Sequence, residues 1–503
     1  MDVELTKQEA EVCDLLEKVV GHVQQQQPDQ PRLTLRIAGG WVRDKLLGMQ
    51  SHDIDIAVDH MSGYDLAQHV NQYLVDHGCA VHTIAKISQN PEQSKHLETA
   101  TTRVLGQMVD FVNLRSEKYT ADSRIPQIEF GTPLEDALRR DITINSMFYN
   151  IHTRTVEDFT KRGLDDLKAG IVRTPLEPFQ TFTDDPLRVL RVLRFASRFD
   201  FVIDESTAAA IRQPDIRRDL DAKIRCERVG IELDKMASGP HPLLSIRMVL
   251  GFGLYAHVFR APPQDKWVSG QDQALDDSVA EGMTRSVLEI LDGDGCEACL
   301  PLERFPEVGS EMSPSQIRRA LVLAAYLYPY HAVTVPDRKR TASLPFIVLR
   351  DGIKLSIHDG DAVAALHTLA PKISDIAGRC QSGPAVSRKE LGLLIREAGA
   401  RWPMATIFAA AVDSLQGHMT KDAVNAKYEA FIDAVVASDL VQAFGFKHIV
   451  NGKAVAKLLG IKPGPALKGI LDQVMCWQLQ YPQGSREECE EFILAEIAPT
   501  LQS

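Results

Sequence analysis

The chain has 503 residues, of which 44% are hydrophobic and 25% are charged, the composition of a folded globular protein with room for several domains. These values exclude a disulfide-stapled miniprotein and a low-complexity or collagen-like chain, and no apolar run reaches the ~20 residues of a membrane span. The formal net charge of −12 argues against a protein that coats nucleic acid over its whole surface.

Cysteine usage and the N-terminal segment give two further expectations. The eight cysteines have no framework spacing, which favours a reducing compartment. Cys296 and Cys299 form a lone CxxC without a second pair, and we interpret them as free thiols rather than as a zinc or redox site. The acidic, amphipathic N-terminus does not have the pattern of a targeting peptide.

The first ~170 residues alternate between strand and helix patterns, which indicates an α+β domain. Residues 33–38 have the alternation and β-branching of a strand, and Gly39 and Gly40 end it. A helix is predicted over 41–47 and a half-buried strand over 53–58. Further strand patterns cover 80–87, 103–114 and 127–130.

Helical periodicity dominates the rest of the chain, from Asp185 to the C-terminus, so we place a boundary near residue 175. Two polar, aperiodic stretches at 261–282 and 300–314 interrupt it, and we interpret them as surface loops or linkers between helical parts.

Two carboxylates on the strand over 53–58 are candidate metal ligands. Asp53 and Asp55 are two residues apart and therefore lie on the same face of the strand. Such hard oxygen ligands suit Mg²⁺. Asp110 lies in another strand-like run, which we expect to be adjacent, and offers a third carboxylate. The alternative is an ordinary exposed strand that alternates acidic and apolar residues.

The glycine pair before these aspartates is a candidate phosphate-binding loop. Gly39 and Gly40 stand at a strand-to-helix junction, where backbone N–H groups can approach a phosphate closely, and Arg43 follows. A plain tight turn would also explain the glycines. A phosphate loop followed about ten residues later by metal ligands favours a triphosphate site.

A row of arginines follows Asp185. With Asp185 as the N-cap and Pro186 at the first helical position, four arginines share about a third of the helix circumference. They are Arg188, Arg191, Arg194 and Arg198. A solvated basic face is the alternative, but four arginines without a lysine favour planar recognition of phosphates or bases.

Asp185 and Arg188 lie three residues apart and are neighbours at the helix start. Together a carboxylate acceptor and a guanidinium donor match the edge of cytosine or adenine, where an exocyclic amine stands beside an unprotonated ring nitrogen. Guanine and uracil present the opposite pattern, so the pair would select CTP and ATP. The alternative is a simple salt bridge between the two side chains.

In combination, these motifs resemble the class II tRNA nucleotidyltransferases, the CCA-adding enzymes of the polymerase β nucleotidyltransferase superfamily. The chain shares with them the patterns Gly39-Gly40-x-Val-Arg43-Asp44, Asp53-x-Asp55, Arg139-Arg140-Asp141-x-Thr-x-Asn145, Asp184-Asp185-x-x-Arg188-x-x-Arg191-x-x-Arg194 and Glu227-Arg228-x-x-x-Glu232. Residues 94–102 and 110–119 resemble the eukaryotic, particularly the fungal, members. Bacterial members have Glu-Asp where this chain has Asp184-Asp185.

The resemblance implies a mixed five-stranded catalytic head at 1–175, followed by an all-helical neck at 176–240, body at 241–435 and tail at 436–503. It also implies template-independent addition of C, C and A to the 3′ end of tRNA, by metal-assisted attack on the α-phosphate with release of pyrophosphate. The expected substrates are CTP and ATP, and the expected cofactor is Mg²⁺.

The resemblance further assigns roles to individual residues. Asp53 and Asp55 would bind the catalytic metals, with Asp110 as the candidate third carboxylate, and Gly39, Gly40 and Arg43 would contact the triphosphate. Arg140 and Asp141 would hold the ribose, Asp185 and Arg188 would read the base, and Arg191 and Arg194 would support that site or the triphosphate. The final motif, Glu227, Arg228 and Glu232, would brace the arginine helix. Residues 116–129 would form the flexible element that helps the site change from C to A.

The segment from Val441 to Leu471 contains five lysines and no acidic residue: Lys447, Lys453, Lys457, Lys462 and Lys468. We interpret it as a surface for the tRNA acceptor and TΨC arm, although a basic patch that balances an acidic body is the alternative.

Other activities remain open at this point: a CC-only or A-only enzyme, a related poly(A) polymerase, or an inactive tRNA-binding module. We further expect a monomer without membrane association, present in cytoplasm, nucleus and mitochondrion by family resemblance.

Overall fold

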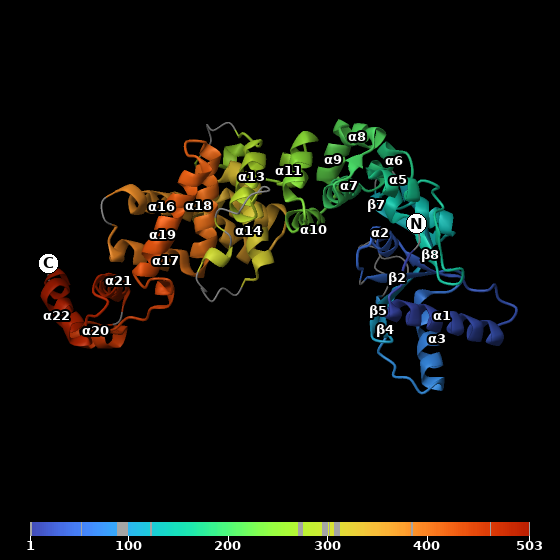
Figure 1. Cartoon of the computed structure of the whole chain (residues 1–503), viewed down its shortest axis with the longest axis horizontal. Helices are drawn as coiled ribbons and strands as arrows, with labels where there is room; N and C mark the ends of the chain where they lie inside the picture. Colours follow the sequence, from blue (N-terminus) through green and yellow to red (C-terminus); the bar gives the residue numbers. More distant parts are fainter. Residues whose placement is uncertain are drawn as a thin grey trace. The chain divides into compact units, whose positions relative to one another are not determined.

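The structure is a computed structural model that describes residues 3–51, 53–87, 99–120, 123–269, 275–293, 300, 302–305, 312–383, 386–462 and 464–501 (Figure 1). It divides into two compact units, Met1–Val258 and Phe259–Ser503. The CxxC of Cys296 and Cys299 and residues 94–98 of the fungal-like motif lie outside the described residues. The predicted boundaries at residues 175, 240 and 435 stay predictions.

A main sheet of seven strands, in the order β3-β4-β5-β2-β1-β8-β9, forms the centre of unit 1. Its strands are β1 (Leu35–Ala38), β2 (Ile54–Val58), β3 (Ala85–Ile87), β4 (Thr99–Val104), β5 (Gln107–Asn113), β8 (Phe148–Asn150) and β9 (Thr155–Glu157). β2 and β5 run parallel and the other pairs run antiparallel, so the sheet is mixed as predicted.

Two details of the predicted sheet are wrong. The sheet has seven strands rather than the five that the resemblance implies. β3 lies within the strand predicted over 80–87, whereas β8 and β9 have three residues each and are too short to give a periodic pattern. The single strand predicted over 103–114 is a hairpin of β4 and β5. Leu105 and Gly106 turn the chain there with positive φ angles of 49° and 84°.

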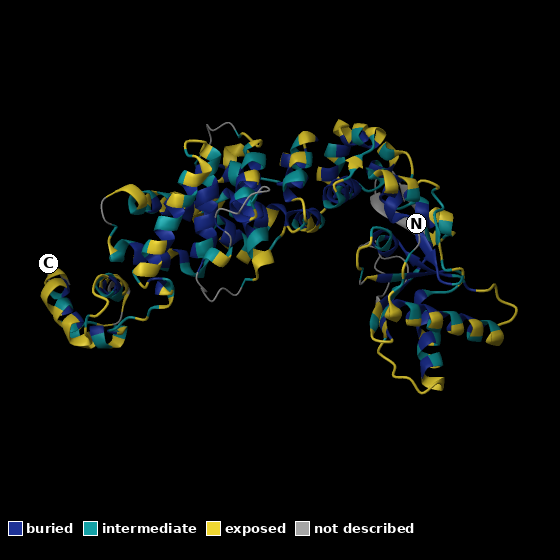
Figure 2. Cartoon of the chain, in the orientation of Figure 1, coloured by how far each residue is buried: buried dark blue, intermediate teal, exposed yellow. Residues whose placement is uncertain are grey.

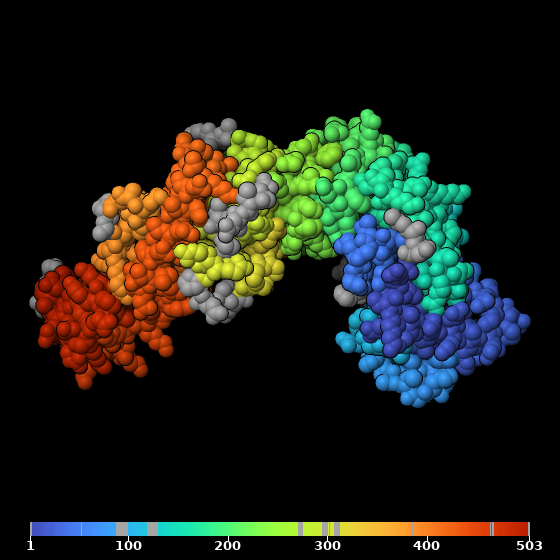
Figure 3. Space-filling view, viewed as in Figure 1, coloured from blue at the N-terminus to red at the C-terminus, as the bar shows by residue number. Residues whose placement is uncertain are grey.

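Twelve helices in the described part of unit 1 surround the sheet or follow it. They are α1 (Lys7–Gln26), α2 (Gly40–Leu46), α3 (Gly63–Asp76), α4 (Pro133–Leu138), α5 (Gly163–Ala169), α6 (Pro178–Asp184), α7 (Leu187–Phe199), α8 (Glu205–Ile211), α9 (Pro214–Lys223), α10 (Cys226–Ala237), α11 (Pro242–Gly251) and α12 (Tyr255–Val258). α3 packs on β2, β4 and β5, and α1 packs on α3 (Figure 1). Figure 3 shows unit 1 as a space-filling view in blue, teal and green.

The arginine helix is α7, which packs against α6, α10 and α11. Its apolar side chains Val189, Leu190, Val192 and Leu193 are all fully buried, as an amphipathic pattern predicts. Two of its arginines, Arg188 and Arg194, are buried as well, with 9% and 7% of their surface exposed. Those guanidinium groups therefore face protein rather than solvent, and α7 is not a solvated basic face.

Short strand pairs interrupt the otherwise helical remainder. β10 (Ile171–Val172) pairs in parallel with β11 (Val202–Ile203) around α7, and β12 (Thr334–Asp337) forms a hairpin with β13 (Arg340–Ser343). A third pair, β6 (Arg115–Thr120) and β7 (Ser123–Phe130), forms an antiparallel hairpin where the resemblance predicts a flexible element.

Unit 2 consists mainly of packed helices. They are α13 (Val279–Leu291), α14 (Pro314–Tyr326), α15 (Leu344–Ile347), α16 (Ile357–Ser382), α17 (Arg388–Ala398), α18 (Trp402–Gln416), α19 (Lys421–Ala437), α20 (Gly452–Leu459), α21 (Pro465–Gln480) and α22 (Arg486–Phe492). Figure 2 shows the buried residues of each unit in its interior. A buried Asp413 carboxylate joins α18 to α19, because it accepts hydrogen bonds from Lys427 Nζ at 2.7 Å and Tyr428 OH at 2.8 Å.

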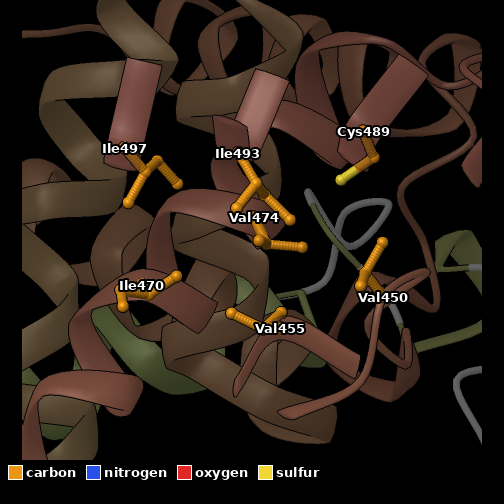
Figure 4. Close-up of a cluster of buried hydrophobic side chains, with 7 residues drawn as sticks. All are labelled: Val450, Val455, Ile470, Val474, Cys489, Ile493 and Ile497. Carbon is orange, nitrogen blue, oxygen red and sulfur yellow. The ribbon is translucent and has the colours of Figure 1, made fainter. Parts of the chain in front are cut away.

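The C-terminal helices α20, α21 and α22 have a separate small core. It consists of Val450, Val455, Ile470, Val474, Cys489, Ile493 and Ile497 (Figure 4). Burial raises the pKa of the Cys489 thiol to about 11, so this cysteine is a packing residue rather than a nucleophile. The five lysines of this segment are all exposed.

No helix in the described part of the chain is long and apolar enough to span a membrane.

Candidate active site

A cavity of about 510 Å³ in unit 1 brings most of the predicted site residues together. Residues of β1, β2, β5, β6, α2, α7 and α10 contribute to its lining. The lining includes nine arginines and four carboxylates, a composition that suits a polyanionic ligand. The arginines are Arg43, Arg115, Arg139, Arg140, Arg188, Arg191, Arg194, Arg198 and Arg228, and the carboxylates are Asp55, Glu117, Asp141 and Asp185.

The three predicted metal ligands form one cluster. Asp55 on β2 is the register partner of Asp110 on the parallel strand β5, so the predicted adjacency of these strands is confirmed. One carboxylate oxygen from each of Asp53, Asp55 and Asp110 lies within 4.8 Å of the others. Three hard oxygen donors at this separation fit a divalent cation such as Mg²⁺.

The electrostatics of this carboxylate cluster also fit a cation. Burial and the neighbouring charges of Asp53 and Asp110 raise the pKa of Asp55 to about 6, although Arg140 and Arg115 oppose the shift. Three carboxylates held this close repel one another, and a bound cation would relieve the repulsion.

Gly39 has a structural role in addition to the phosphate contact predicted for the glycine pair, and that contact stays a prediction. Gly39 has φ +71°, and a Cβ there would lie 2.5 Å from Nη1 of Arg140. Its absent side chain therefore makes room for that guanidinium group. Gly40 lines the cavity and begins α2, a helix of only seven residues.

Arg43 is buried between two aromatic rings of α7. Its guanidinium carbon lies 4.9 Å from the centroid of Phe195 and 4.8 Å from that of Phe199. Its Nε donates to Asp44 at 2.8 Å and its Nη1 donates to the side-chain oxygen of Asn145. Arg43 thus joins α2, the segment after Asp141 and α7, and one edge of it reaches the cavity.

Asp136 on α4 organises two of the cavity arginines, and the sequence reasoning missed it. Arg139 donates to Asp136 Oδ1 through Nε at 2.9 Å, and Arg140 donates to Oδ2 through Nε at 3.0 Å and Nη2 at 2.9 Å. Burial alone would raise the pKa of Asp136, but Arg140 and Arg139 hold it at about 2. The i,i+3 and i,i+4 spacing of the two arginines, which directly follow the end of α4, was the signal that could have found it.

Asp141 and Arg191, predicted to act in separate subsites, form one ion pair. Asp141 accepts from Arg191 Nε at 2.8 Å and lies 2.7 Å from its Nη2. It also accepts from the backbone N–H of Ile142 at 2.9 Å and from Asn145 Nδ2 at 3.1 Å. Burial raises the pKa of Asp141, but Arg191 and these hydrogen bonds outweigh burial and hold it at about 2.

Asp185 and Arg188 both line the cavity, and their contacts run to different parts of the molecule. Leu187 N–H donates to Asp185 Oδ1 at 3.2 Å, but the N-cap of α7 is Pro186 rather than Asp185, and the helix begins at Leu187, one residue later than predicted. The carboxylate of Asp185 also pairs with Arg228 of α10 at 3.0 Å. Arg188 Nη2 donates to the carbonyl of Arg139 at 2.7 Å and lies 3.6 Å from Glu117.

Each arginine of α7 therefore meets a carboxylate from another element. Arg194 donates to Glu232 of α10 at 2.5 Å, and Arg198 lies 3.5 Å from Asp44 of α2. These partners complete the row of ion pairs: Arg188 with Glu117, Arg191 with Asp141, Arg194 with Glu232 and Arg198 with Asp44. Because each carboxylate restricts its arginine, the guanidinium groups are oriented before a ligand arrives.

Comparison with known proteins agrees with this arrangement. Residues 35–173 match the family model of the poly A polymerase head domain. The chain is 39% identical to the mitochondrial CCA tRNA nucleotidyltransferase of Saccharomyces cerevisiae, over 97% of this chain and 92% of that protein. It is 38% identical to the mitochondrial CCA tRNA nucleotidyltransferase of Candida glabrata, over 99% of this chain and 97% of that protein.

Solved structures show the same fold at lower identity. A CCA-adding enzyme in complex with ATP matches with a TM-score of 0.63 at 20% identity, over 99% of this chain and 95% of that one. The Bacillus stearothermophilus CCA-adding enzyme in complex with CTP matches with a TM-score of 0.64 at 18% identity, over 99% of this chain and 100% of that one. The Thermotoga maritima CCA-adding enzyme in complex with tRNA matches with a TM-score of 0.60 at 19% identity, over 98% of this chain and 96% of that one.

A fold built from a mixed sheet and a long helical remainder, with a carboxylate cluster beside an arginine-lined cavity, defines a nucleotidyltransferase. The identity to the two yeast proteins over nearly the whole chain is more specific: the chain belongs to the CCA tRNA nucleotidyltransferase family, as its motifs predicted.

Proposed function

We propose that this protein adds C, C and A to the 3′ end of tRNA, with CTP and ATP as substrates and pyrophosphate as the leaving product. The observation that carries the proposal is that Asp55, Asp185 and Arg188 line one cavity. A metal-binding group and a base-reading pair thus belong to the same site. The names of the two yeast relatives, and solved structures with ATP, CTP and tRNA, support it.

The cofactor we propose is Mg²⁺, held by Asp53 and Asp55 with Asp110 as a third ligand. Magnesium bound there supplies Lewis-acid polarisation of the α-phosphate and a lowered pKa at the attacking 3′-hydroxyl. The carboxylates themselves orient that hydroxyl toward the nucleotide.

The arginines bind the nucleotide. Gly40 and Arg43 border the cavity on the side of α2. We assign the contact with the triphosphate to these two residues together with Gly39, which makes room for Arg140. Arg140 holds the ribose in this proposal, and Asp141 acts through another residue. Because Asp141 is paired with Arg191, its part is to position that arginine, while Arg140 offers donors to the sugar hydroxyls. Arg191 and Arg194 add positive charge beside the phosphates.

Asp185 and Arg188 read the base. Asp185 accepts a hydrogen bond from the exocyclic amine, and Arg188 donates to the neighbouring ring nitrogen, a pattern that cytosine and adenine satisfy. Guanine and uracil would leave acceptor facing acceptor and donor facing donor. Mismatched polar groups in a site built for hydrogen bonds give rejection of about 10⁴-fold or more. Arg228 fixes the Asp185 carboxylate, and Glu117 and the Arg139 carbonyl fix Arg188.

The lysine-rich C-terminal segment supplies the tRNA contact in this proposal. Lys453 and Lys457 on α20 and Lys468 on α21 are exposed, as are Lys447 and Lys462. We assign to them the acceptor and TΨC arm, whose duplexes are recognised by shape and backbone. We also propose that the protein acts as a monomer, divided into head, neck, body and tail at residues 175, 240 and 435. Since both yeast relatives are named mitochondrial, we place it in the mitochondrion, with further pools in nucleus and cytoplasm.

One experiment tests the activity and separates it from its rivals. Three tRNAs serve as substrates: one that ends before CCA, one that ends after the first C and one that ends after CC. Labelled CTP, ATP, GTP and UTP are supplied to each tRNA, first one at a time and then as a mixture. The proposal expects two C residues and then a single A. Arrest after CC, or A addition only to tRNA ending in CC, would identify a CC-only or A-only enzyme. Unlimited A addition would identify a poly(A) polymerase, and tRNA binding without incorporation an inactive binding module.

A second experiment tests the base-reading pair. Arg188→Ala should raise incorporation of GTP and UTP relative to CTP and ATP, because the donor that rejects guanine and uracil is lost. Arg247→Ala, on the exposed surface of α11, is the matched control and should keep the parent selectivity. Unchanged rejection of GTP and UTP by Arg188→Ala would place base recognition elsewhere.

A further inference from the structure

A second cavity of about 370 Å³ lies on α7 beside the active-site cavity. It lies among the C-terminal half of α7, the end of α10 and the start of α11. Its lining residues are Arg194, Ser197, Arg198, Lys235, Met236, Ser238, Gly239, Pro240, His241 and Ser245. Arg194 and Arg198 line both cavities, so the two are neighbours along one face of the same helix.

The charge of this second cavity is positive. Arg194, Arg198 and Lys235 contribute cationic side chains, and none of the lining residues, all of which are described, is acidic. Arg194 and Arg198 are each balanced by a carboxylate behind them, Glu232 and Asp44. Lys235 is exposed at the rim, and within the described residues it has no ion pair. In a chain of net charge −12, a concave site with this composition selects anions.

The floor of the cavity is rigid and uncharged. Ser197 on α7 and Ser245 on α11 each have only 2% of their surface exposed, and their hydroxyl oxygens lie 2.8 Å apart in a hydrogen bond. Ser197 Oγ also donates to the carbonyl of Arg194 at 3.1 Å. These bonds fix α11 against α7, so the cationic side chains surround a preformed hollow.

We infer that this cavity binds a backbone phosphate of the RNA strand whose 3′ end is extended in the neighbouring cavity. The inference rests on the proposed function and names a contact that the motifs do not include. Phosphate and sugar groups together receive half to two-thirds of the hydrogen bonds between proteins and DNA, and these contacts set the register of the protein on the strand. A phosphate held between Lys235 and the two shared arginines would fix the strand next to the nucleotide site.

Two substitutions test the contact in the full-length protein: Lys235→Ala and Lys235→Glu. Equilibrium binding of tRNA, measured by fluorescence anisotropy across a salt series, needs no catalysis. Lys235→Ala should weaken binding about threefold to tenfold and lower the slope of log Kd against log salt by about 0.7 to 1. Lys235→Glu should weaken binding further. Both should raise the KM for tRNA and leave the KM for CTP near the parent value.

The matched control is Lys168→Glu on α5, an exposed lysine that lines neither cavity. It carries the same change of net charge, so a general electrostatic effect would weaken tRNA binding equally in this variant. Equal weakening would overturn the inference. Thermal unfolding of the three variants confirms that the fold is retained, which the exposure of both lysines leads us to expect.

Other outcomes identify other occupants. Pyrophosphate inhibition that weakens in Lys235→Glu, with unchanged tRNA binding, would make the cavity a site for the free product and overturn the inference. Unchanged tRNA affinity and salt slope in both Lys235 variants would also overturn it. If the parent protein binds tRNA but adds no CCA, the proposed function fails while the binding measurement still decides the contact.

Discussion

The two sides of the active-site cavity treat carboxylates in opposite ways. On the sheet side, Asp53, Asp55 and Asp110 are grouped together, and burial with mutual repulsion raises the pKa of Asp55 to about 6. On the helical side, Asp136 and Asp141 are more deeply buried, yet arginine partners hold the pKa of each at about 2. The pKa values of aspartates within one site therefore differ by about 4, from about 6 for Asp55 to about 2 for Asp136 and Asp141.

The difference teaches what each group is for. Carboxylates that repel one another bind a cation favourably, so this cluster fits a metal ion. A carboxylate that already accepts hydrogen bonds from guanidinium groups is neutralised by them and does not attract a metal ion. Its effect is to fix the arginines that face the ligand. The cavity therefore separates cation binding from anion binding over a short distance, as an enzyme of phosphoryl chemistry requires.

The largest expected effect comes from removal of the sheet-side carboxylates. Asp53→Ala and Asp55→Ala should each lower kcat by about 10³-fold or more, because metal stabilisation of the transition state is worth several kcal/mol. tRNA binding should persist, since the arginines and lysines are untouched. Asp76→Ala, at the exposed end of α3, is the control and should keep full turnover. Turnover near the parent rate in Asp55→Ala would refute the metal assignment.

Removal of the charge of Asp136 should destabilise the helical side of the cavity. Asp136→Asn leaves Arg139 and Arg140 without their shared carboxylate, and loss of one partner of a buried pair costs about 3 kcal/mol in the free energy of unfolding. Urea denaturation measures the loss. Asp215→Asn removes the partner of Arg218 in an exposed pair and should change stability by less than about 1 kcal/mol. Equal effects of the two variants would mean that Asp136 is not a central element of the site.

The pH dependence of stability should have opposite signs on the two sides. The pKa of Asp55 is raised above its ordinary 3.8, so its stabilising form is protonated and is lost as the pH rises through about 6. In EDTA at pH 7.5, Asp55→Asn should therefore raise stability by about 2 kcal/mol, and this gain should shrink toward pH 4.

Asp141 gives the reverse sign. Its pKa is lowered to about 2, so its contribution is present above about pH 4 and is lost as the pH falls through about 2. Asp141→Asn should lower stability at pH 7.5, and the loss should shrink in acid. Thermal unfolding of both variants from pH 2 to pH 8 measures the contrast. Parallel curves for the two would remove the distinction between the two sides.

The smallest expected effect concerns the aromatic rings around Arg43. Phe199→Leu removes one of the two rings that face the guanidinium, a contact worth about 0.5–1 kcal/mol. The KM for CTP should rise about twofold to fivefold as Arg43 loses its fixed orientation. Phe199→Tyr keeps a ring at this position and should restore most of the affinity. A KM that is the same in both variants would show that the ring does not position Arg43.

Much of the site could be predicted from the sequence because its signals are local. The two-residue spacing of Asp53 and Asp55 fixes their common face on β2, and the periodicity of the arginines gathers them on α7. The strand, turn and helix from residue 33 to residue 58 follow from alternation and glycine placement, and the structure has them within one or two residues at most boundaries.

The parts that failed depend on contacts between distant segments. The family resemblance predicted that Glu232 braces the arginine helix, but no spacing rule gives its contact with Arg194 across 38 residues, or that of Asp141 with Arg191 across 50. The expectation of a flexible glycine loop missed that Gly39 makes room for Arg140, more than a hundred residues away. The strands β8 and β9 were missed because three residues carry no period.

The sequence by itself determined which residues could do the chemistry: the carboxylates of β2 and β5, the glycine pair, the arginine helix and the acid–arginine pair at its start. Only the tertiary structure decided which carboxylates are free for a cation and which are already paired with arginine. The physical reason is that the affinity of a carboxylate depends on the charges and burial around it. Those are set by segments that meet only when the sheet and α7 pack together.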